Sequence, residues 1–365
     1  MNPVKPLLND KLSRPDWINV PERDPDFLWL DKNENLDSVF VELINKEVIA
    51  KQVGNIDLST YPELGSLYKD LSAMDNVDPR QVLLTTGSDG AIRTVFQTFV
   101  EPGAKVFVTN PSFAMYDVYC KVYGAETFYV NYERVGERIY IDVAKLIALI
   151  SHERPRLVCL PNPDSPTGTV LPESDIMDIH AACVAVDAML FIDEAYYPFY
   201  EKTMAAHIGK EGISNLIVCR TFSKAWGLAG VRVGHLISDK DTISFMNKTR
   251  PMYEIGALAM KIAHTALPYY NQMMESVAVI TEGKDFFEHE MRELGFMTLG
   301  TFGNFSHVAF GKHKEILFEQ LDRFVYYRKD FAHPSLQGFT RFSAAPIEIM
   351  KKVVDSIRIT ITSSI

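Results

Sequence analysis

The chain has 365 residues, of which 47% are hydrophobic and 23% charged, a composition that excludes a disordered or fibrous protein. Its 47 Asp and Glu against 37 Lys and Arg give a net charge of -10. This balance argues against nucleic-acid binding as the main activity, because neutralising phosphates requires a cationic surface. The length predicts one large domain with an appendage, or two domains.

The four cysteines, Cys120, Cys159, Cys183 and Cys219, include no C-x-x-C pair and no Cys/His cluster with zinc spacing, so we expect no metal site. Three of them lie in or beside apolar runs, where a cysteine is usually a small buried hydrophobe. Residues 1–17 lack the apolar core of a signal peptide, and no apolar stretch approaches the roughly 18 residues of a membrane span. We therefore expect a soluble, cytoplasmic protein that does not bind membranes.

Between about residues 80 and 240, short β-branched runs alternate with longer helical patterns. Each run is nearly continuously apolar, as expected of strands that are buried on both faces of a parallel sheet. The segments between them, such as 91–100 and 172–186, are long enough to be crossover helices. We predict an α/β domain with a mostly parallel sheet, with strands at 82–86, 105–108, 127–130, 156–160, 189–192 and 216–219.

The two ends of the chain differ from this pattern. The first 45 residues are polar and interrupted by prolines, whereas long helical stretches and then short strands follow about residue 255. The short strands are predicted at 297–299 and 339–342, and a closing helix at 349–357. We predict an arm that forms part of a small domain at 1–45, a large domain at 46–255 and a small α+β domain at 256–365.

Polar residues directly follow four of the predicted strands, and ligands of open α/β sheets bind at the carboxyl ends of strands. Ser88 and Asp89 open a helix after the first strand, where free backbone N–H groups suit an anion, although the same residues also fit a capped turn. Asp193 and Tyr196 follow strand 189–192. They could hold a cationic ring nitrogen and a phenolic oxygen, or Asp193 could simply cap the next segment.

The two remaining motifs are richer in polar groups. Thr221, Ser223, Lys224 and Arg232 occur together among three glycines, where the lysine suits a nucleophile and the hydroxyls with the arginine suit a phosphate. A solvated loop lysine is the alternative, but the large apolar residues around it argue against that. The loop at 161–168 holds three prolines and a glycine, and this rigidity favours a site over a plain turn.

In this order, the four motifs resemble the fold-type I pyridoxal-phosphate aminotransferases of class I and II, specifically the histidinol-phosphate aminotransferase-like branch. The resemblance runs from Asn33-Glu34-Asn35 to Arg341, and its most specific part is the segment 223–234. It implies fold type I: a large domain whose sheet, of the seven-stranded type, is mostly parallel and flanked by helices, with a smaller α+β domain.

The resemblance implies pyridoxal 5'-phosphate as the cofactor and names the residues around its ring. Lys224 is the lysine that bonds covalently to the cofactor and moves a proton during the reaction. Asp193 keeps the pyridine nitrogen protonated, Tyr196 bonds the phenolic oxygen, and Phe113 stacks on the ring face. Lys224, Asp193 and Tyr196 are therefore the expected catalytic residues.

The resemblance also implies how the anionic groups are held. The cofactor phosphate is expected on the N–H groups at Ser88 and Asp89, with three side chains around it, those of Thr221, Ser223 and Arg232. Tyr61 matches a tyrosine that reaches the neighbouring subunit's phosphate, which implies a homodimer with shared sites. Arg341 matches the arginine that grips the substrate's carboxylate or phosphate, and Asn33 is expected at the substrate as well.

The sequence departs from the family pattern at several positions. Ser165 stands where the family usually has an asparagine that contacts the ring oxygen, so either the serine hydroxyl or Asn162 is expected to make this contact. Leu36 replaces a usual proline, and Glu254 stands where asparagine is common. These changes leave the cofactor residues in place, but they put histidinol phosphate in question as the substrate.

We expect an aminotransferase that moves an amino group from an amino acid donor, glutamate, to a small oxo compound, phosphorylated or not. One alternative is a decarboxylase of a phosphorylated amino acid, similar to threonine-phosphate decarboxylase, since both activities use the same lysine and aspartate. A more distant alternative is a non-catalytic ligand-binding descendant. The presence of Lys224, Asp193 and Arg232 together favours chemistry over binding alone.

Overall fold

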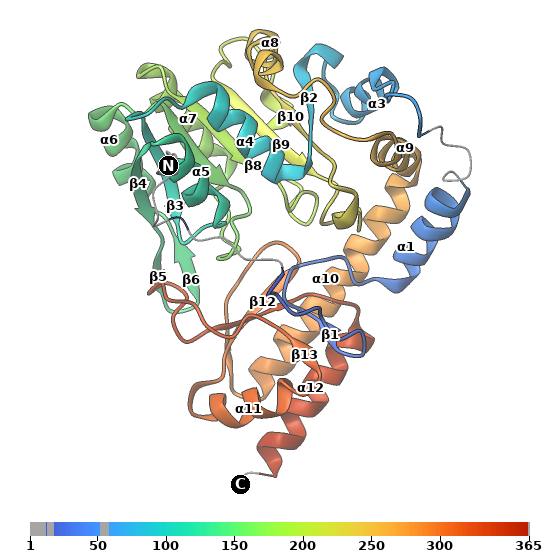
Figure 1. Ribbon diagram of the computed structural model, residues 1–365. Coiled ribbons are helices and arrows are strands. Elements are labelled where there is room, and N and C mark those ends of the chain that lie inside the picture. The colour runs from blue at the N-terminus through green and yellow to red at the C-terminus, as the bar shows by residue number, and fades with distance from the viewer. Residues whose placement is uncertain (1–11, 13–17, 52–57, 364–365) are drawn as a thin grey trace, which may run out of the picture.

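The computed structural model describes residues 12, 18–51 and 58–363 (Figure 1). A seven-stranded sheet lies in the upper part of Figure 1, with the strand order β2-β10-β9-β8-β7-β3-β4. All its strand pairs are parallel except those of β10, which is antiparallel to both neighbours. In sheet order the strands are β2 (Val82–Thr85), β10 (Gly234–Ile237), β9 (Leu216–Thr221), β8 (Met189–Asp193), β7 (Leu157–Pro161), β3 (Lys105–Asn110) and β4 (Glu126–Asn131).

The predicted α/β class and mostly parallel sheet are confirmed, and each predicted strand ends within two residues of the observed one. The sequence pattern did not reveal β10, because its first residues continue the glycine-rich motif before it. The first residue of β10, Gly234, has to be a glycine, because a Cβ there would lie 2.7 Å from the Arg220 carbonyl oxygen and 2.8 Å from the Gly87 carbonyl carbon. The strand therefore approaches its neighbours more closely than a side chain would allow.

Helices cover both faces of this sheet. Alternate strand residues point to opposite sides, so Val158 and Leu190 pack against α6 and α7, whereas Phe191 and Cys219 pack on the side of α4, α5 and α8. The four cysteines are free and buried in these two cores. The helices are α4 (Gly87–Phe99), α5 (Met115–Tyr123), α6 (Val143–Glu153), α7 (Glu173–Ala185) and α8 (Lys240–Thr249).

A second group of elements lies in the lower part of Figure 1. A three-stranded sheet, β11 (Met297–Thr298), β12 (Phe305–Ala309) and β14 (Thr340–Ser343), packs with α11 (Lys314–Leu321) and α12 (Ile347–Thr362). The N-terminal strand β1 (Leu28–Trp29) pairs with β13 (Val325–Tyr326), so the arm packs against the C-terminal elements. Residues 1–11 and 13–17 of the predicted arm lie outside the described residues. The predicted domain boundaries remain a prediction.

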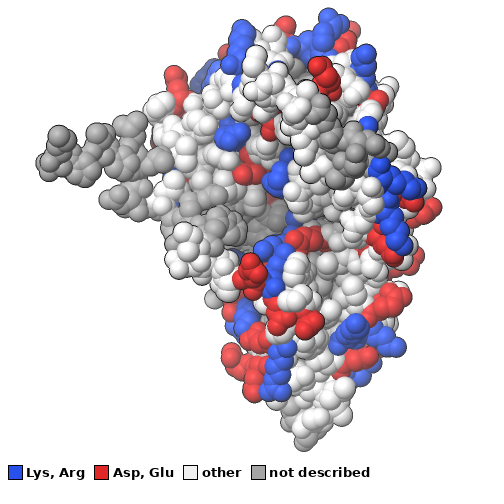
Figure 2. Space-filling view, turned by 45° about the vertical axis from the view of Figure 1, so that its right-hand side comes forward, with Lys and Arg blue, Asp and Glu red and all other residues white. Residues whose placement is uncertain are grey.

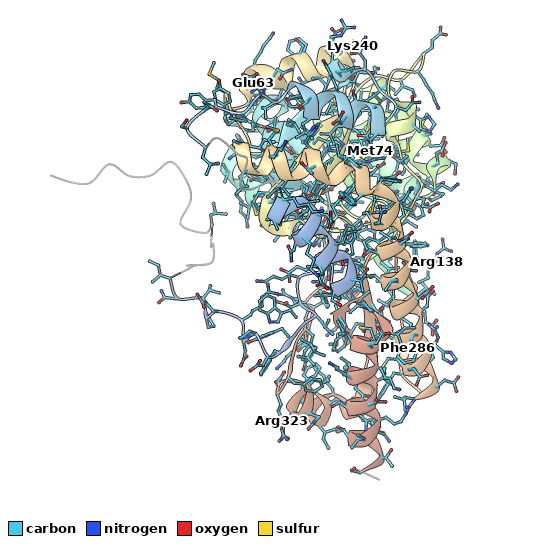
Figure 3. The ribbon with its side chains drawn as sticks, turned by 90° about the vertical axis from the view of Figure 1, so that its right-hand side faces the viewer. Glu63, Met74, Arg138, Lys240, Phe286 and Arg323 are labelled. Atoms are coloured by element: carbon cyan, nitrogen blue, oxygen red, sulfur yellow. The ribbon has the colours of Figure 1, made fainter. Side chains whose placement is uncertain are left out.

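The long helix α10 (Tyr270–Glu293) connects the two groups, as Figures 1 and 3 show. Its start packs with α1 (Ser38–Leu43), α3 (Gly65–Met74) and α9 (Ala257–Ala266), and its end, near Phe286 in Figure 3, joins the lower core. A Cβ at Gly283 would lie 1.8 Å from the Ala345 carbonyl oxygen, so the absence of a side chain there lets the chain before α12 cross α10. A π-helix (Ile44–Ala50) extends α1, and β5 (Glu133–Val135) pairs with β6 (Arg138–Tyr140).

The surface charge and the helix lengths concern the expectations about nucleic-acid binding and about membranes. On the face that Figure 2 shows, acidic and basic side chains are mixed in small groups and no broad cationic patch covers the described residues. None of the helices in the described part of the chain is both long enough and apolar enough to pass through a bilayer.

Candidate active site

The carboxyl ends of β7, β8 and β9 and the start of α4 meet at a cavity of about 370 Å³. Because parallel strands end at one edge of a sheet, the polar residues that follow them come together there. The three-stranded sheet and the N-terminal segment close the opposite side. The lining residues are Asp31, Lys32, Asn33, Ser88, Asp89, Phe113, Pro161, Pro163, Ser165, Asp193, Ala195, Tyr196, Ser223, Lys224, Arg232 and Arg341.

Asp193 lies at the inner wall of this cavity and is only 5% exposed. Its carboxylate accepts hydrogen bonds from the Tyr116 hydroxyl at 2.9 Å and from the Ala195 N–H at 3.0 Å. Burial raises the pKa of Asp193 to about 6, while these two hydrogen bonds act in the opposite direction. The group is therefore mainly a carboxylate at neutral pH, and it can accept a further bond from a cationic N–H.

Lys224 and Tyr196 line the same cavity. The Lys224 Nζ donates to the Lys32 carbonyl oxygen at 2.9 Å and lies 5.7 Å from the centre of the Tyr196 ring. The Tyr196 hydroxyl accepts a bond from the Asn33 side-chain amide at 2.9 Å. Asn33 is buried in the left-handed region with φ of 55°, a conformation that asparagine tolerates better than most residues. An amine, a phenol and a carboxylate thus share one cavity.

A cradle for an anion lies at the start of α4. The residue before the helix, Thr86, makes no side-chain bond to the first helical amides, so these N–H groups are available to a ligand. Arg232 reaches the same place and donates to the Ser223 hydroxyl at 3.2 Å. Gly87 permits this approach, because its φ is 71° and a Cβ there would lie 2.8 Å from the Arg232 Nη2. Thr221 is buried behind the cradle, where its hydroxyl bonds the Ser223 hydroxyl at 3.0 Å.

Arg341, on β14, faces the cavity from the opposite side. Its Nη2 donates to the Asp31 carbonyl oxygen at 3.0 Å, whereas its buried Nε has no hydrogen-bond partner among the described residues. Burial lowers the pKa of this guanidinium. A desolvated arginine with an unused donor is suited to an anionic group of a ligand.

Three of the predicted cofactor residues do not line the cavity: Thr221, which lies behind the cradle, Asn162 and Tyr61. Both polar atoms of the Asn162 side chain bond the backbone of Leu171, at 2.8 and 3.3 Å, so this amide holds its own loop together. Ser165 does line the cavity, which favours the serine for the ring-oxygen contact. Tyr61 is 74% exposed and stacks on Tyr253 with ring centres 4.3 Å apart, away from the cavity of its own chain.

Sequence reasoning missed several residues of the site. Tyr116 holds Asp193, and its only signal is its position three residues after Phe113, at the start of α5. Asp31 and Lys32 line the cavity directly before the Asn33 motif, so their adjacency was the available signal. Phe113 itself lines the cavity with 43% of its surface exposed, as a ring-stacking residue requires.

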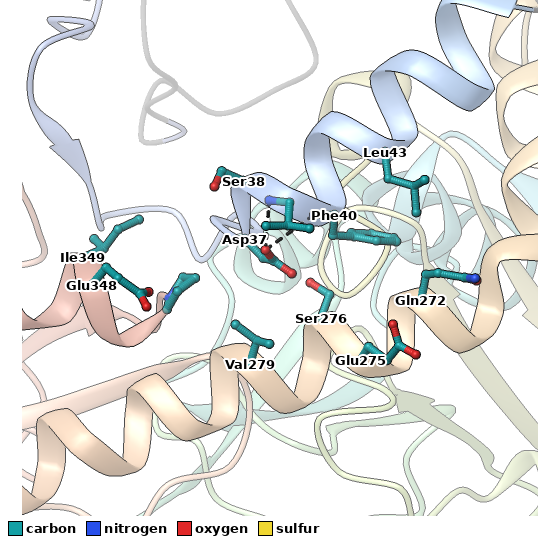
Figure 4. Close-up of a pocket in the computed structure, with 12 residues that line it drawn as sticks. Asp37, Ser38, Phe40, Leu43, Gln272, Glu275, Ser276, Val279, Glu348 and Ile349 are labelled. Carbon is teal, nitrogen blue, oxygen red and sulfur yellow. Dashed lines mark hydrogen bonds between the residues drawn. The ribbon is translucent and has the colours of Figure 1, made fainter.

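A second cavity, of about 600 Å³, lies between α1, α10 and the start of α12 (Figure 4). Its residue Asp37 caps α1 by accepting bonds from the N–H groups of Val39 and Phe40, drawn as dashed lines in Figure 4. No lysine, arginine, histidine or cysteine is among the described residues that line it. Although it is larger, its described lining offers no basic side chain for an anion and no amine for a covalent bond.

Comparisons with known proteins agree with this geometry. The family model described as aminotransferase class I and II matches residues 25–357. The histidinol-phosphate aminotransferase of Thermoanaerobacter pseudethanolicus is 30% identical over 90% of this chain and 92% of its own length.

Solved structures show the same fold. The histidinol-phosphate aminotransferase of Sinorhizobium meliloti in complex with pyridoxal-5'-phosphate superposes with a TM-score of 0.79 at 24% identity, over 93% of this chain and 92% of the other. The L-threonine-O-3-phosphate decarboxylase of Porphyromonas gingivalis gives a TM-score of 0.74 at 20% identity, over 92% and 99%. The fold is thus common to transaminases and decarboxylases and does not distinguish them.

The pKa of Asp193 predicts how ligand binding depends on pH. Below about pH 6 the Asp193 carboxylate takes up a proton and can no longer accept a hydrogen bond from a pyridinium N–H. The affinity for pyridoxal phosphate should therefore fall as the pH drops from about 7.5 to about 5. We expect Asp193→Asn to bind more weakly and without this pH dependence. Titration of both proteins in a Lys224→Ala background measures this non-covalent binding. An equally pH-dependent Asp193→Asn variant would contradict the assignment.

Proposed function

The chain belongs to the class I and II aminotransferases, and on this premise we propose that it is a pyridoxal-phosphate-dependent transaminase that moves an amino group from glutamate to a small oxo compound bearing an anionic group. The comparisons confirm the family, the enzyme class and the cofactor predicted from the sequence. The observation that carries the proposal is the convergence of Lys224, Asp193 and the Arg232 cradle on one cavity.

The residues present fit the cofactor at both of its charged ends. Asp193 offers a carboxylate for a protonated ring nitrogen, and the open amides of α4 with Arg232 and Ser223 offer donors for a phosphate. When bound, pyridoxal phosphate draws electrons from the substrate's α-carbon. Tyr196 is proposed to donate a hydrogen bond from its hydroxyl to the phenolic oxygen of the cofactor, and Asn33 orients that hydroxyl. Ser165 is proposed as a second contact to the same oxygen.

Lys224 is proposed as the base. Its Nζ is held by one backbone carbonyl, that of Lys32, so the amine can leave this bond when substrate enters. The Nζ would accept the proton that leaves the substrate's α-carbon and deliver it to the carbon on the far side of the substrate's nitrogen, which completes a 1,3-transfer. Phe113 covers the ring face and limits the access of water to this step.

Arg341 defines the proposed substrate class. Its unpaired Nε and its place in the cavity suit a carboxylate of the donor, or a carboxylate or phosphate of the acceptor. The relatives are named for histidinol phosphate, so this amino compound is the first to test as an alternative donor. Other anionic substrates are tested beside it because Glu254 replaces the asparagine that is common in the family, although Glu254 does not line the cavity of its own chain.

We propose further that the active unit is a cytoplasmic homodimer with shared sites. Tyr61 is exposed and does not line the cavity of its own chain, so its predicted phosphate contact requires a second copy. Tyr253, on which Tyr61 stacks, is also exposed, as are Met252 and Leu258 close to Tyr253 in the sequence, so apolar side chains are exposed in this part of the chain. Burying such a surface favours association.

We expect purified protein with pyridoxal phosphate to convert glutamate to 2-oxoglutarate when an oxo acceptor is present. Lys224→Ala should lower this turnover by about 10³-fold or more, because the base and the covalent attachment are lost together. Lys224→Arg, which keeps the charge, should be equally inactive. Release of carbon dioxide from phosphothreonine, without any transamination of glutamate or histidinol phosphate, would instead establish the decarboxylase.

Arg341→Gln should raise KM for the anionic substrate about 30-fold, which corresponds to about 2 kcal/mol for a lost charge-assisted hydrogen bond. We expect kcat to change by less than about threefold, because the guanidinium lies at the substrate's anionic end. Arg328→Gln is the matched control, since Arg328 faces Arg341 across the strand bridge without lining the cavity. Equal KM values for both variants would remove Arg341 from substrate binding.

Subunit mixing tests the shared site. We expect Tyr61→Ala to weaken binding of pyridoxal phosphate and Lys224→Ala to be inactive. In a mixed dimer, one site combines the intact Lys224 of one chain with the intact Tyr61 of the other, so refolding an equal mixture should restore about a quarter of the wild-type sites at limiting cofactor. Activity no higher than the mean of the two variants would show that Tyr61 does not act between subunits.

A further inference from the structure

Asp164 is a fully buried carboxyl group next to the cavity that the proposed reaction does not use. It lies in the loop after β7, between Pro163 and Ser165, which both line the cavity while Asp164 points away from it into the protein. Burial raises its pKa to about 7. A buried carboxyl group is costly unless its oxygens are hydrogen-bonded, so its contacts indicate what it does.

The two oxygens of Asp164 bond two different segments. Oδ1 accepts from the Thr167 hydroxyl at 2.8 Å and from the Thr167 N–H at 3.1 Å, which closes its own loop. Oδ2 accepts from the hydroxyls of Thr109 and Ser112, both at 3.2 Å. Thr109 is the second-last residue of β3 and Ser112 follows the strand, so one carboxyl group joins the loop after β7 to the end of β3 and the segment after it.

The segment after β3 carries Phe113, the ring-stacking candidate. Phe113 is 43% exposed, and no ring contact to another aromatic side chain of the described residues holds it. Its direct neighbour Ser112 is bonded to Asp164, and on the other loop Ser165 is the direct neighbour of Asp164. Asp164 is thus linked to two residues that line the cavity from different loops. Ser165 follows it in the sequence, and Phe113 follows its hydrogen-bond partner Ser112.

The chemistry of these contacts favours a positioning role. All four groups around the carboxyl oxygens are neutral donors, and no lysine, arginine or histidine of the described residues forms an ion pair with it. The buried Tyr132, whose hydroxyl lies within hydrogen-bonding reach of Asp164, is a further neutral neighbour. Asp164 therefore does not stabilise the core through an ion pair. Its four hydrogen bonds instead fix the distance between the two loops.

We propose that Asp164 is a positioning residue that sets the placement of Phe113 relative to Ser165 across the cofactor ring. This inference rests on the proposed function, because both residues matter only if pyridoxal phosphate binds between them. Its effect should appear in cofactor affinity and in the asymmetry of the bound ring, which packing of the protein core alone does not determine.

The test compares four single variants of the full-length protein and one double variant. Asp164→Ala removes all four bonds, and Ser112→Ala removes only the link between the loops. Asp164→Asn keeps the shape and can still accept from Thr167 and donate to Ser112. Asp117→Ala is the control, because this half-buried carboxylate on α5 bonds Lys121 and Tyr129, which lie outside the loop after β7.

Three quantities are measured for each: the dissociation constant of pyridoxal phosphate, the visible circular dichroism of the bound cofactor, and the melting temperature of the apo protein. We expect the dissociation constant to rise about tenfold in Asp164→Ala and about threefold in Ser112→Ala, with a weaker dichroic band in both. Asp164→Asn should stay within about threefold of wild type, and Asp117→Ala should match it. Adding Ser112→Ala to Asp164→Ala should have no further effect.

Wild-type affinity and dichroism in both Asp164→Ala and Ser112→Ala would overturn the inference, even if Asp164→Ala melts at a lower temperature. Should Asp164→Ala not fold, Ser112→Ala decides alone, since it removes a single surface-near hydroxyl. If Asp164→Asn bound pyridoxal phosphate as weakly as Asp164→Ala, the positioning role would be overturned, and the negative charge of Asp164 would be the property that matters. If wild type itself binds no pyridoxal phosphate, the proposed function fails, and this inference fails with it.

Discussion

The site depends on the buried carboxylate of Asp193, which forms no ion pair with any of the described residues. Asp193 and Glu194 are adjacent at the end of β8 and both are buried, but only Glu194 has a cation, since Arg220 lies 3.3 Å from it. Asp75 shares the same arginine and also bonds His235, so both of these carboxylates have partners within the fold. Asp193 has only two neutral donors, and burial raises its pKa to about 6. A cationic ligand that binds there therefore supplies the positive charge that Asp193 otherwise lacks as a partner.

The remaining features place other groups around this carboxylate. The parallel strands bring Asp193 and the Lys224 loop to one edge of the sheet, and the antiparallel β10 turns the chain back, so that Arg232 meets the start of α4. Gly87 and Gly234 allow that approach because neither has a Cβ. The three-stranded sheet adds Arg341 from the opposite side. A ring with a nitrogen at one end and a phosphate at the other fits between these groups, which is consistent with the family.

The sequence predicted the sheet well because its strands are buried on both faces and read as continuous apolar runs. It also indicated most of the site, because Asp193, Ser223, Lys224 and Arg232 directly follow strands or lie in one glycine-rich motif. It failed where the tertiary structure decides. The Asn162 amide is bonded to Leu171 nine residues away, and the Tyr116 hydroxyl reaches Asp193 across the sheet, contacts that no local pattern encodes.

The central claim is that Asp193 holds the ring nitrogen of the cofactor in its protonated, cationic form. The most direct measurement is the nitrogen-15 NMR chemical shift of pyridoxal phosphate labelled at the ring nitrogen and bound to the protein at neutral pH. The account predicts the shift of a protonated pyridinium in the wild type and that of a neutral pyridine in Asp193→Ala. A neutral ring nitrogen in the wild type, with the cofactor bound, would contradict it.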